Sequence, residues 1–168
     1  YNPAKPTPNL GGAAYTPQPG PLDQRPLEAR PDVLTFTSAP LSTDADIVGP
    51  VRATLHVHTS AHETDFVARL CMVDADGRSI NLCDGIVRVT PADGGAREIS
   101  VDLWATAQRV RAGQRLRLQV CSAAHPRWAR HTGTAEPLAT ATTLQAAQQT
   151  VFHDAERPSS LHLPLLRL

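Results

Sequence analysis

The clearest hydrophobic pattern lies between residues 47 and 85, where two apolar stretches are separated by a short polar loop. Apolar and polar positions alternate over residues 51–58, which is the period of a β-strand with one buried face. Residues 66–73 are apolar at nearly every position except Arg69, which is typical of a strand buried on both faces. Turn residues at 74–77 and a returning strand at 79–83 complete a predicted antiparallel meander.

Further short strands are predicted on both sides of this meander, at residues 33–37, 86–90, 99–103, 116–120, 151–152 and 161–165. Residues 91–95 have the composition of a short turn, whereas residues 138–149 mix helix-favouring Ala and Gln with strand-favouring Thr. Eight or nine short strands without a long helical pattern predict an all-β sandwich, with Phe66 and Leu118 in its core.

The first 32 residues differ from the rest, because they contain eight of the fifteen prolines. This composition argues against a regular helix or a central strand. We therefore expect an extended arm over residues 1–32, which lies on the surface of a single domain at residues 33–168. The chain does not begin with Met and has no signal-peptide pattern, so we expect a piece of a longer protein.

The amino-acid composition limits the kinds of partner that the chain is expected to bind. Sixteen basic and sixteen acidic residues give zero net charge, and there is no basic run, so nucleic-acid binding is not expected. No apolar run reaches the ~18 residues of a membrane span, and the bacterial cytoplasm is favoured over secretion. Cys71, Cys83 and Cys121 lie in apolar strand patterns, which predicts buried free thiols, with a disulfide as the alternative.

No stretch of the chain predicts a catalytic centre or a cofactor site. The nearest approach to a nucleophile elbow is at residues 77–81, where Ser79 follows Gly77, but the second glycine and the strand-to-helix context are missing. His56, His58 and His62 have a spacing that could hold zinc. Because no third or fourth ligand is evident, we interpret these histidines as solvated or interface residues and expect no metal.

The carboxylates and the aromatic residues can each be interpreted as structural or as functional residues. Asp65, Asp84 and Asp102 lie beside strand segments and could do acid–base work, but buried Asp residues in β-sandwiches more often accept hydrogen bonds from loops. The aromatic residues are too few to indicate a platform for sugar binding.

Several short motifs occur in the order expected of one family, at residues 23–26, 32–34, 64–68, 76–78, 82–88, 102–106, 111–118, 126–128 and 153–159. Together they resemble the C-terminal domain of the X-Pro dipeptidyl-peptidase and cocaine-esterase-like (CocE/NonD) serine hydrolases. Residues of these motifs to which we assign a structural role are Asp65, Asp84, Asp102, Trp104, Arg127, Trp128 and Asp154.

The resemblance implies a jelly-roll β-sandwich similar to galactose-binding domains. It also implies that this domain follows an α/β-hydrolase domain that holds the Ser-Asp-His triad and is missing here. A Leu-Phe pair of the family's acyl pocket is matched to Leu55 and His56, and His in place of Phe suggests a more polar substrate. Family members also carry a longer insert after the position of Val89.

Two functions follow as hypotheses. In the first, the domain is non-catalytic, packs on the catalytic domain of an esterase, amidase or X-Pro dipeptidyl-peptidase, and shapes its substrate pocket. Thr54, His58 and His62 would then join His56 at the docking edge, which in the isolated chain would be exposed or used in self-association. In the second, the chain is a carbohydrate-binding jelly-roll module, an analogy that rests on fold alone.

Overall fold

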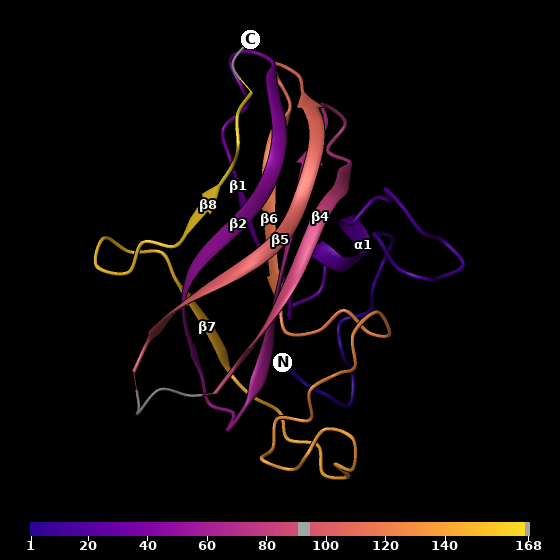
Figure 1. The fold of residues 1–168 in the computed structure, drawn as a ribbon, viewed down its shortest axis with the longest axis vertical. Coiled ribbons are helices and arrows are strands. Elements are labelled where there is room, and N and C mark those ends of the chain that lie inside the picture. The colour runs from indigo at the N-terminus through magenta and orange to yellow at the C-terminus, as the bar shows by residue number, and fades with distance from the viewer. Residues whose placement is uncertain (91–94, 167–168) are drawn as a thin grey trace.

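The computed structural model describes residues 1–90 and 95–166, which form two antiparallel sheets packed face to face (Figure 1). The first sheet has the order β1 (Leu34–Thr37), β6 (Arg115–Cys121), β3 (Thr64–Val73) and β4 (Ser79–Val89). The second has the order β5 (Arg97–Val110), β2 (Ala45–Thr59) and β7 (Gln149–Phe152), and β8 (Ser160–His162) also pairs with β2. The predicted β-sandwich is confirmed, while the jelly-roll and galactose-binding-like assignments stay predictions.

The hydrophobic pattern places the core as expected. In β2, Val51, Ala53, Leu55 and Val57 are buried and the residues between them are not, so the alternation marks one inner face. Strand β3 lies between β4 and β6 and is buried on both faces, including Arg69. Phe66 and Leu118 are both buried, as predicted.

Several strand boundaries differ from the predicted ones. The segments at 79–83 and 86–90 form one strand, β4, and the segment at 99–103 extends into the long strand β5. Residues 138–148 form neither a helix nor a strand, because no run of alternating apolar residues gives them a face to bury. The short turn expected at 91–95 lies outside the described residues, except for Gly95.

The proline-rich arm is more ordered than its composition predicts. It contains a one-turn helix, α1 (Arg25–Glu28), in which Pro26 occupies the first turn, where a proline is tolerated because no N–H is needed there. The expectation of no helix in residues 1–32 is therefore wrong for this turn. Gln24 and Leu27 are buried, so the end of the arm belongs to the folded domain rather than resting on it. No helix in the described ranges is long and apolar enough to cross a membrane.

The sandwich is closed along one edge and open along the other. Edge strands β4 and β5 lie side by side in Figure 1. A Cβ atom on Gly85 would lie 1.8 Å from the backbone oxygen of Asp102, so the two backbones touch there. On the other edge, among the described residues, β1 pairs with β6 alone, while β7 and β8 pair with β2. Among the described residues, no strand pairing joins the two sheets at either edge, and the edges differ in how closely the backbones approach each other.

Candidate docking site

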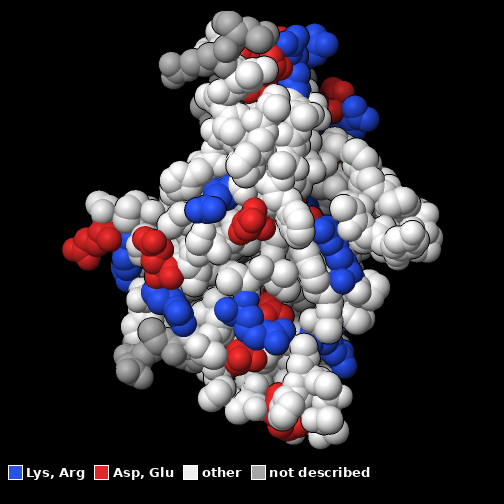
Figure 2. Space-filling view, in the orientation of Figure 1, with Lys and Arg blue, Asp and Glu red and all other residues white. Residues whose placement is uncertain are grey.

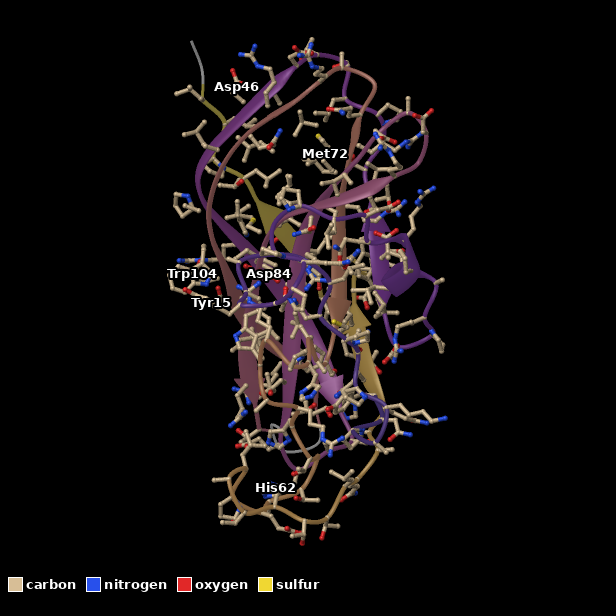
Figure 3. The ribbon with its side chains drawn as sticks, turned by 90° about the vertical axis from the view of Figure 1, so that its right-hand side faces the viewer. Tyr15, Asp46, His62, Met72, Asp84 and Trp104 are labelled. Carbon is tan, nitrogen blue, oxygen red and sulfur yellow. The ribbon has the colours of Figure 1, made fainter. Side chains whose placement is uncertain are left out.

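Four of the motif residues meet at one hollow on the surface, namely Asp84, Trp104, Arg127 and Trp128. The hollow has a volume of about 410 Å³ and lies between β4, β5, the 126–128 loop and the arm at Gly12 and Ala13. Figure 3 shows Trp104 and Asp84, which both line the hollow, at about the mid-height of the molecule. The sequence motifs, which are scattered over the chain, are thus partly gathered into one place.

Asp84 anchors the floor of this hollow through two arginines. Its Oδ2 accepts hydrogen bonds from Arg69 Nε at 3.4 Å and Nη2 at 3.2 Å, and its Oδ1 is paired with Arg127 Nη1. Arg69 also donates to the side chains of Gln24 at 2.8 Å and Asn9 at 3.1 Å. Because a buried charge is stable only when it is paired and hydrogen-bonded, this cluster explains how a strand of the core tolerates an arginine.

The same cluster fastens the arm to the sheet. Gln24 Nε2 donates to the backbone oxygens of Leu10 and Leu22 and to Asn81 Oδ1, at 3.0–3.1 Å. The backbone N–H of Leu22 donates to Asn81 Oδ1 at 2.7 Å. The arm therefore carries Tyr15 on a loop whose two ends are held in place.

Trp104 is the most unusual residue of the site. The residue is 72% exposed, and its backbone φ is 65°. It is the only non-glycine residue with a positive φ among those described. The β2–β5 register shifts between Pro50 and Arg52, opposite this position, and Asp102 Oδ1 accepts the Trp104 N–H at 2.8 Å. Such strained residues cost about 1–3 kcal/mol and cluster at functional sites.

Trp128 lines this hollow, and Tyr15 lines an adjoining hollow that shares Arg127 and Trp128 with it. Tyr15 is fully exposed, and the guanidinium of Arg127 lies 4.4 Å above the ring of Trp128. Sequence reasoning missed Tyr15, for which the only signal was an aromatic residue within the Gly- and Pro-rich arm. For Trp104 the signal was the break in the alternation of β5, where Leu103 and Trp104 are both apolar.

The other motif carboxylates lie outside this hollow. Asp65 is buried and accepts a hydrogen bond from Arg88 Nε at 2.9 Å across β3 and β4. Asp154 is exposed and pairs with Arg157 at 2.7 Å within the loop after β7. Figure 2 shows the same mixture on one face, where acidic and basic side chains are interspersed.

The two residues matched to the family's acyl pocket, Leu55 and His56, lie on opposite faces of β2. They are neighbours on β2, so their side chains point to opposite faces of the sheet. Leu55 is 1% exposed and belongs to the core, whereas His56 faces outward, with Nε2 3.5 Å from Glu98. This separation follows from the alternation of β2, and the role of the pair at a substrate pocket stays a prediction.

The remaining predicted interface residues follow the outer face of β2 into the next loop. Thr54 Oγ1 lies 3.3 Å from His162 Nε2 on β8, and His58 is half-buried. His62 is exposed and lies near the lower end of the molecule in Figure 3, whereas Trp104 lies at about mid-height. Within residues 1–90 and 95–166, no group of three or more His, Cys, Asp or Glu is placed to hold a metal ion.

Nucleophilic side chains are poorly placed for attack on a substrate. Ser79 is buried at the start of β4, and its Oγ donates to Glu28 Oε1 at 2.5 Å. The three cysteines are free thiols, of which only Cys71 is fully buried. Burial raises the pKa of both Cys71 and Cys83 to about 12 and also raises the pKa of Cys121. Each thiol therefore stays protonated at neutral pH and is a weak nucleophile.

Known proteins similar to this chain are hydrolases of greater length. Cocaine esterase from Rhodococcus sp. (strain MB1 Bresler) is 35% identical over 181 residues, which cover 99% of this chain and 32% of the esterase. A solved α-amino acid ester hydrolase superposes with a TM-score of 0.84 at 27% identity, over 98% of this chain and 31% of the hydrolase.

An aminopeptidase from a marine sediment archaeon, Thaumarchaeota archaeon, shares the fold with a TM-score of 0.85 at 22% identity, over 99% of this chain and 32% of the aminopeptidase. The chain thus spans about a third of the length of these relatives. A family model described as the X-Pro dipeptidyl-peptidase C-terminal non-catalytic domain matches residues 2–162. The chain therefore belongs to the family of X-Pro dipeptidyl-peptidase C-terminal non-catalytic domains.

Proposed function

We propose that this chain is the non-catalytic part of a larger serine hydrolase, and that it packs on an α/β-hydrolase domain and shapes its substrate pocket. The observation that carries the proposal is an aromatic rim of two exposed residues, Trp104 in this hollow and Tyr15 in the adjoining one, which share the walls formed by Arg127 and Trp128. Large apolar side chains in a strained and exposed position are typical of surfaces that bind a partner. The length of the hydrolase relatives supports the same partner, because about two thirds of each lies outside the matched region.

The aromatic rim is the docking face that we favour over the outer row of β2. His56 already faces Glu98, and its backbone N–H donates to Ser159 Oγ at 3.0 Å. Thr54 contacts His162 of the same domain. These residues thus have partners within the chain, whereas Tyr15 and Trp104 expose most of their side chains. A face of this kind within one polypeptide buries about 600–1,500 Å².

Sugar binding is the competing use of the aromatic rim. Exposed tyrosine and tryptophan rings can stack on sugars, but a sugar site also needs free polar groups for the hydroxyls. Here Asp84 is occupied by Arg69 and Arg127, and Asn81 Oδ1 accepts from Leu22 and Gln24. The hollow therefore offers few unused polar groups, which favours a protein partner.

The deciding experiment begins with the coding sequence upstream of Tyr1. We expect a continuous reading frame that encodes a nucleophile elbow, then Asp, then His. The long protein would then be assayed with a series of esters and Xaa-Pro amides, as wild type, as Trp104→Ala and as His56→Ala. Trp104→Ala should change kcat/KM unequally across acyl groups, whereas His56→Ala should change it little.

Four results would contradict this proposal. An upstream frame without a hydrolase domain would remove the partner. Equal effects of Trp104→Ala on all substrates would remove the role in the pocket, and unequal effects of His56→Ala instead would assign docking to the β2 row. Saturable binding in a glycan screen, lost in Trp104→Ala, would favour the sugar-binding function.

A further inference from the structure

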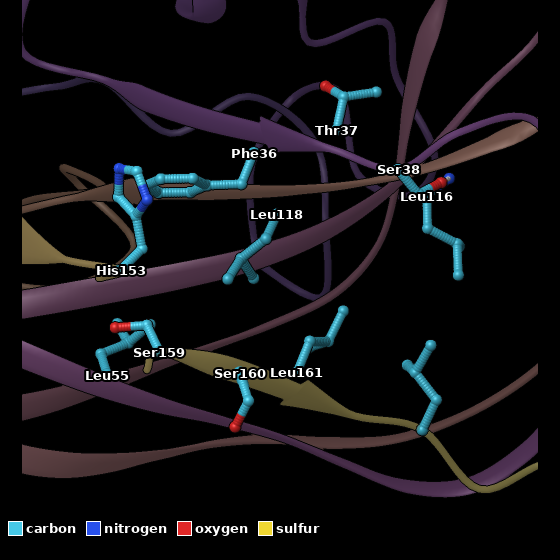
Figure 4. A pocket seen from close by; sticks show the side chains of 11 residues that line it. Phe36, Thr37, Ser38, Leu55, Leu116, Leu118, His153, Ser159, Ser160 and Leu161 are labelled. Atoms are coloured by element: carbon cyan, nitrogen blue, oxygen red, sulfur yellow. Dashed lines mark hydrogen bonds between the residues drawn. The ribbon is translucent and has the colours of Figure 1, made fainter. Parts of the chain in front are cut away.

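An apolar cavity lies along the open edge of the sandwich, between β1 and β6 on one sheet and β8 on the other (Figure 4). Its volume is about 360 Å³. An engineered cavity of about 150 Å³ is large enough to bind benzene. The cavity also falls within the ~300–1,000 Å³ typical of small-molecule sites. It is therefore large enough for a ligand longer than a single ring.

The walls of the cavity are mostly hydrocarbon. The apolar side chains are Phe36, Leu55, Leu116, Leu118, Leu161 and Leu163. Figure 4 shows the first five of them around a common space. None of the lining residues is Asp, Glu, Lys or Arg. Such a lining favours an alkyl chain and provides no carboxylate for a cationic ligand.

The hydroxyls around the cavity are already bonded within the protein. Ser159 Oγ donates to the backbone oxygen of Phe152, Thr37 Oγ1 accepts from Arg117, and Ser38 Oγ donates to Ala39. A ligand with many hydroxyls would therefore find few partners. The cavity is therefore poorly suited to bind a sugar.

One group at the mouth is available to an oxygen atom of a ligand. The ring of His153 packs edge-on against Phe36, with centroids 5.6 Å apart. His153 is exposed, and its ring nitrogens make no hydrogen bond to any described residue. A neutral imidazole carries one N–H donor and a protonated one carries two. The ring is thus positioned to hydrogen-bond the polar end of a molecule whose chain lies among the leucines.

We propose that this cavity binds a medium-chain aliphatic carboxylic acid, with the alkyl chain between the two sheets and the carboxylate at His153. The inference does not depend on the proposed hydrolase domain, because all the groups involved belong to this chain. A side chain of another protein domain is the competing occupant, and it would leave free acids without measurable affinity.

The test uses the 168-residue chain with decanoate, and with decylamine as the ligand of equal chain length and opposite charge. Titration followed by calorimetry and by leucine methyl NMR should show saturable binding of one decanoate, with shifts at Leu118 and Leu161. Decylamine should bind at least about tenfold more weakly. A decanoate dissociation constant above about 1 mM, or shifts confined to other leucines, would overturn the proposal.

Two variants locate the site. Leu161→Trp fills the cavity and should abolish decanoate binding, whereas Leu144→Trp, on an exposed loop position, should leave it unchanged. His153→Ala should remove the preference for decanoate over decylamine. A folded Leu161→Trp protein that binds as well as wild type would disprove the assignment. If Leu161→Trp fails to fold by circular dichroism, the methyl shifts of the wild-type protein decide the question.

Discussion

Arg69 and Asp84 are cross-strand partners in the register of β3 and β4, and their side chains form an ion pair at 3.2 Å inside the protein. Both side chains are almost fully buried, at 4% and 6% exposure. The pair links the core sheet, the arm and the 126–128 loop, because each residue has a further partner in one of these segments.

Asp84→Asn should strongly destabilise the fold. The substitution keeps the shape of the side chain but leaves the Arg69 charge buried without its counterion. Loss of one partner of a buried pair costs about 3–5 kcal/mol in the free energy of unfolding. Urea denaturation measures this change, and Asp154→Asn, which breaks an exposed pair, serves as the control that should change little. Equal effects of the two variants would contradict the buried network.

Phe66→Ala should remove a central part of the core. Phe66 is 1% exposed and belongs to the main hydrophobic cluster, so truncation should cost about 3–5 kcal/mol. Leu144→Ala, at a partly exposed position, should stay within about 0.5 kcal/mol of wild type. A small loss for Phe66→Ala in thermal or urea unfolding would mean that the two sheets do not pack through this residue.

Trp104→Gly should be more stable than Trp104→Ala. At φ of 65° a glycine is unstrained, whereas a residue with Cβ costs roughly 1–2 kcal/mol. Ala107→Gly in the same strand should have the opposite effect and destabilise by about 0.5–1 kcal/mol. The comparison requires the urea midpoints of the wild type, Trp104→Gly, Trp104→Ala and Ala107→Gly. Trp104→Ala matching or exceeding Trp104→Gly would show that the backbone at this position is not strained.

The buried thiols should make stability fall at alkaline pH. In the unfolded chain a thiol loses its proton near the reference pKa of 9.0, whereas Cys71 and Cys83 in the folded protein keep theirs up to about 12. Since the unfolded state releases protons first, the free energy of unfolding should decrease as pH rises above about 9.

Alkylation with iodoacetamide gives an independent measure of the same burial. At pH 8 the folded protein should react slowly, and unfolding in urea should release three reactive thiols. A Cys71→Ala, Cys83→Ala double variant should lose most of the alkaline decrease in stability. Rapid labelling of the native protein would contradict the raised pKa values.

Local patterns were sufficient to predict the sandwich, but not the site. The alternation in β2 and the continuous apolar run in β3 depend on neighbouring residues, so Val57 and Phe66 could be assigned to the core directly. The Asp84 network joins residues 9, 24, 69, 84 and 127, whose proximity follows from the strand order rather than from spacing. The strain at Trp104 likewise arises from the irregular pairing with β2.

The helix α1 shows a different reason for a wrong prediction. Proline content argued against regular structure, yet one turn forms because Pro26 lies where its missing N–H has no cost. The buried Gln24 next to it is held by Leu10, Leu22, Asn81 and Arg69. Tertiary contacts therefore order a segment whose own composition favours disorder.

The contact between Gly85 and Asp102 also bears on how the molecule can move. No side chain separates these two backbones, so they cannot approach each other further at the β4–β5 edge. This edge should therefore act as a fixed hinge between the two sheets. At the opposite edge, the described residues join the two sheets through side chains, such as Phe36 against His153 and Gln149 Nε2 donating to Thr64 Oγ1. Any opening motion of the sandwich should therefore separate the two sheets at the edge of β1, β7 and β8 and leave the β4–β5 edge unchanged. A bulkier residue at position 85 would instead force the backbones of β4 and β5 apart, so the sheets would separate at this edge.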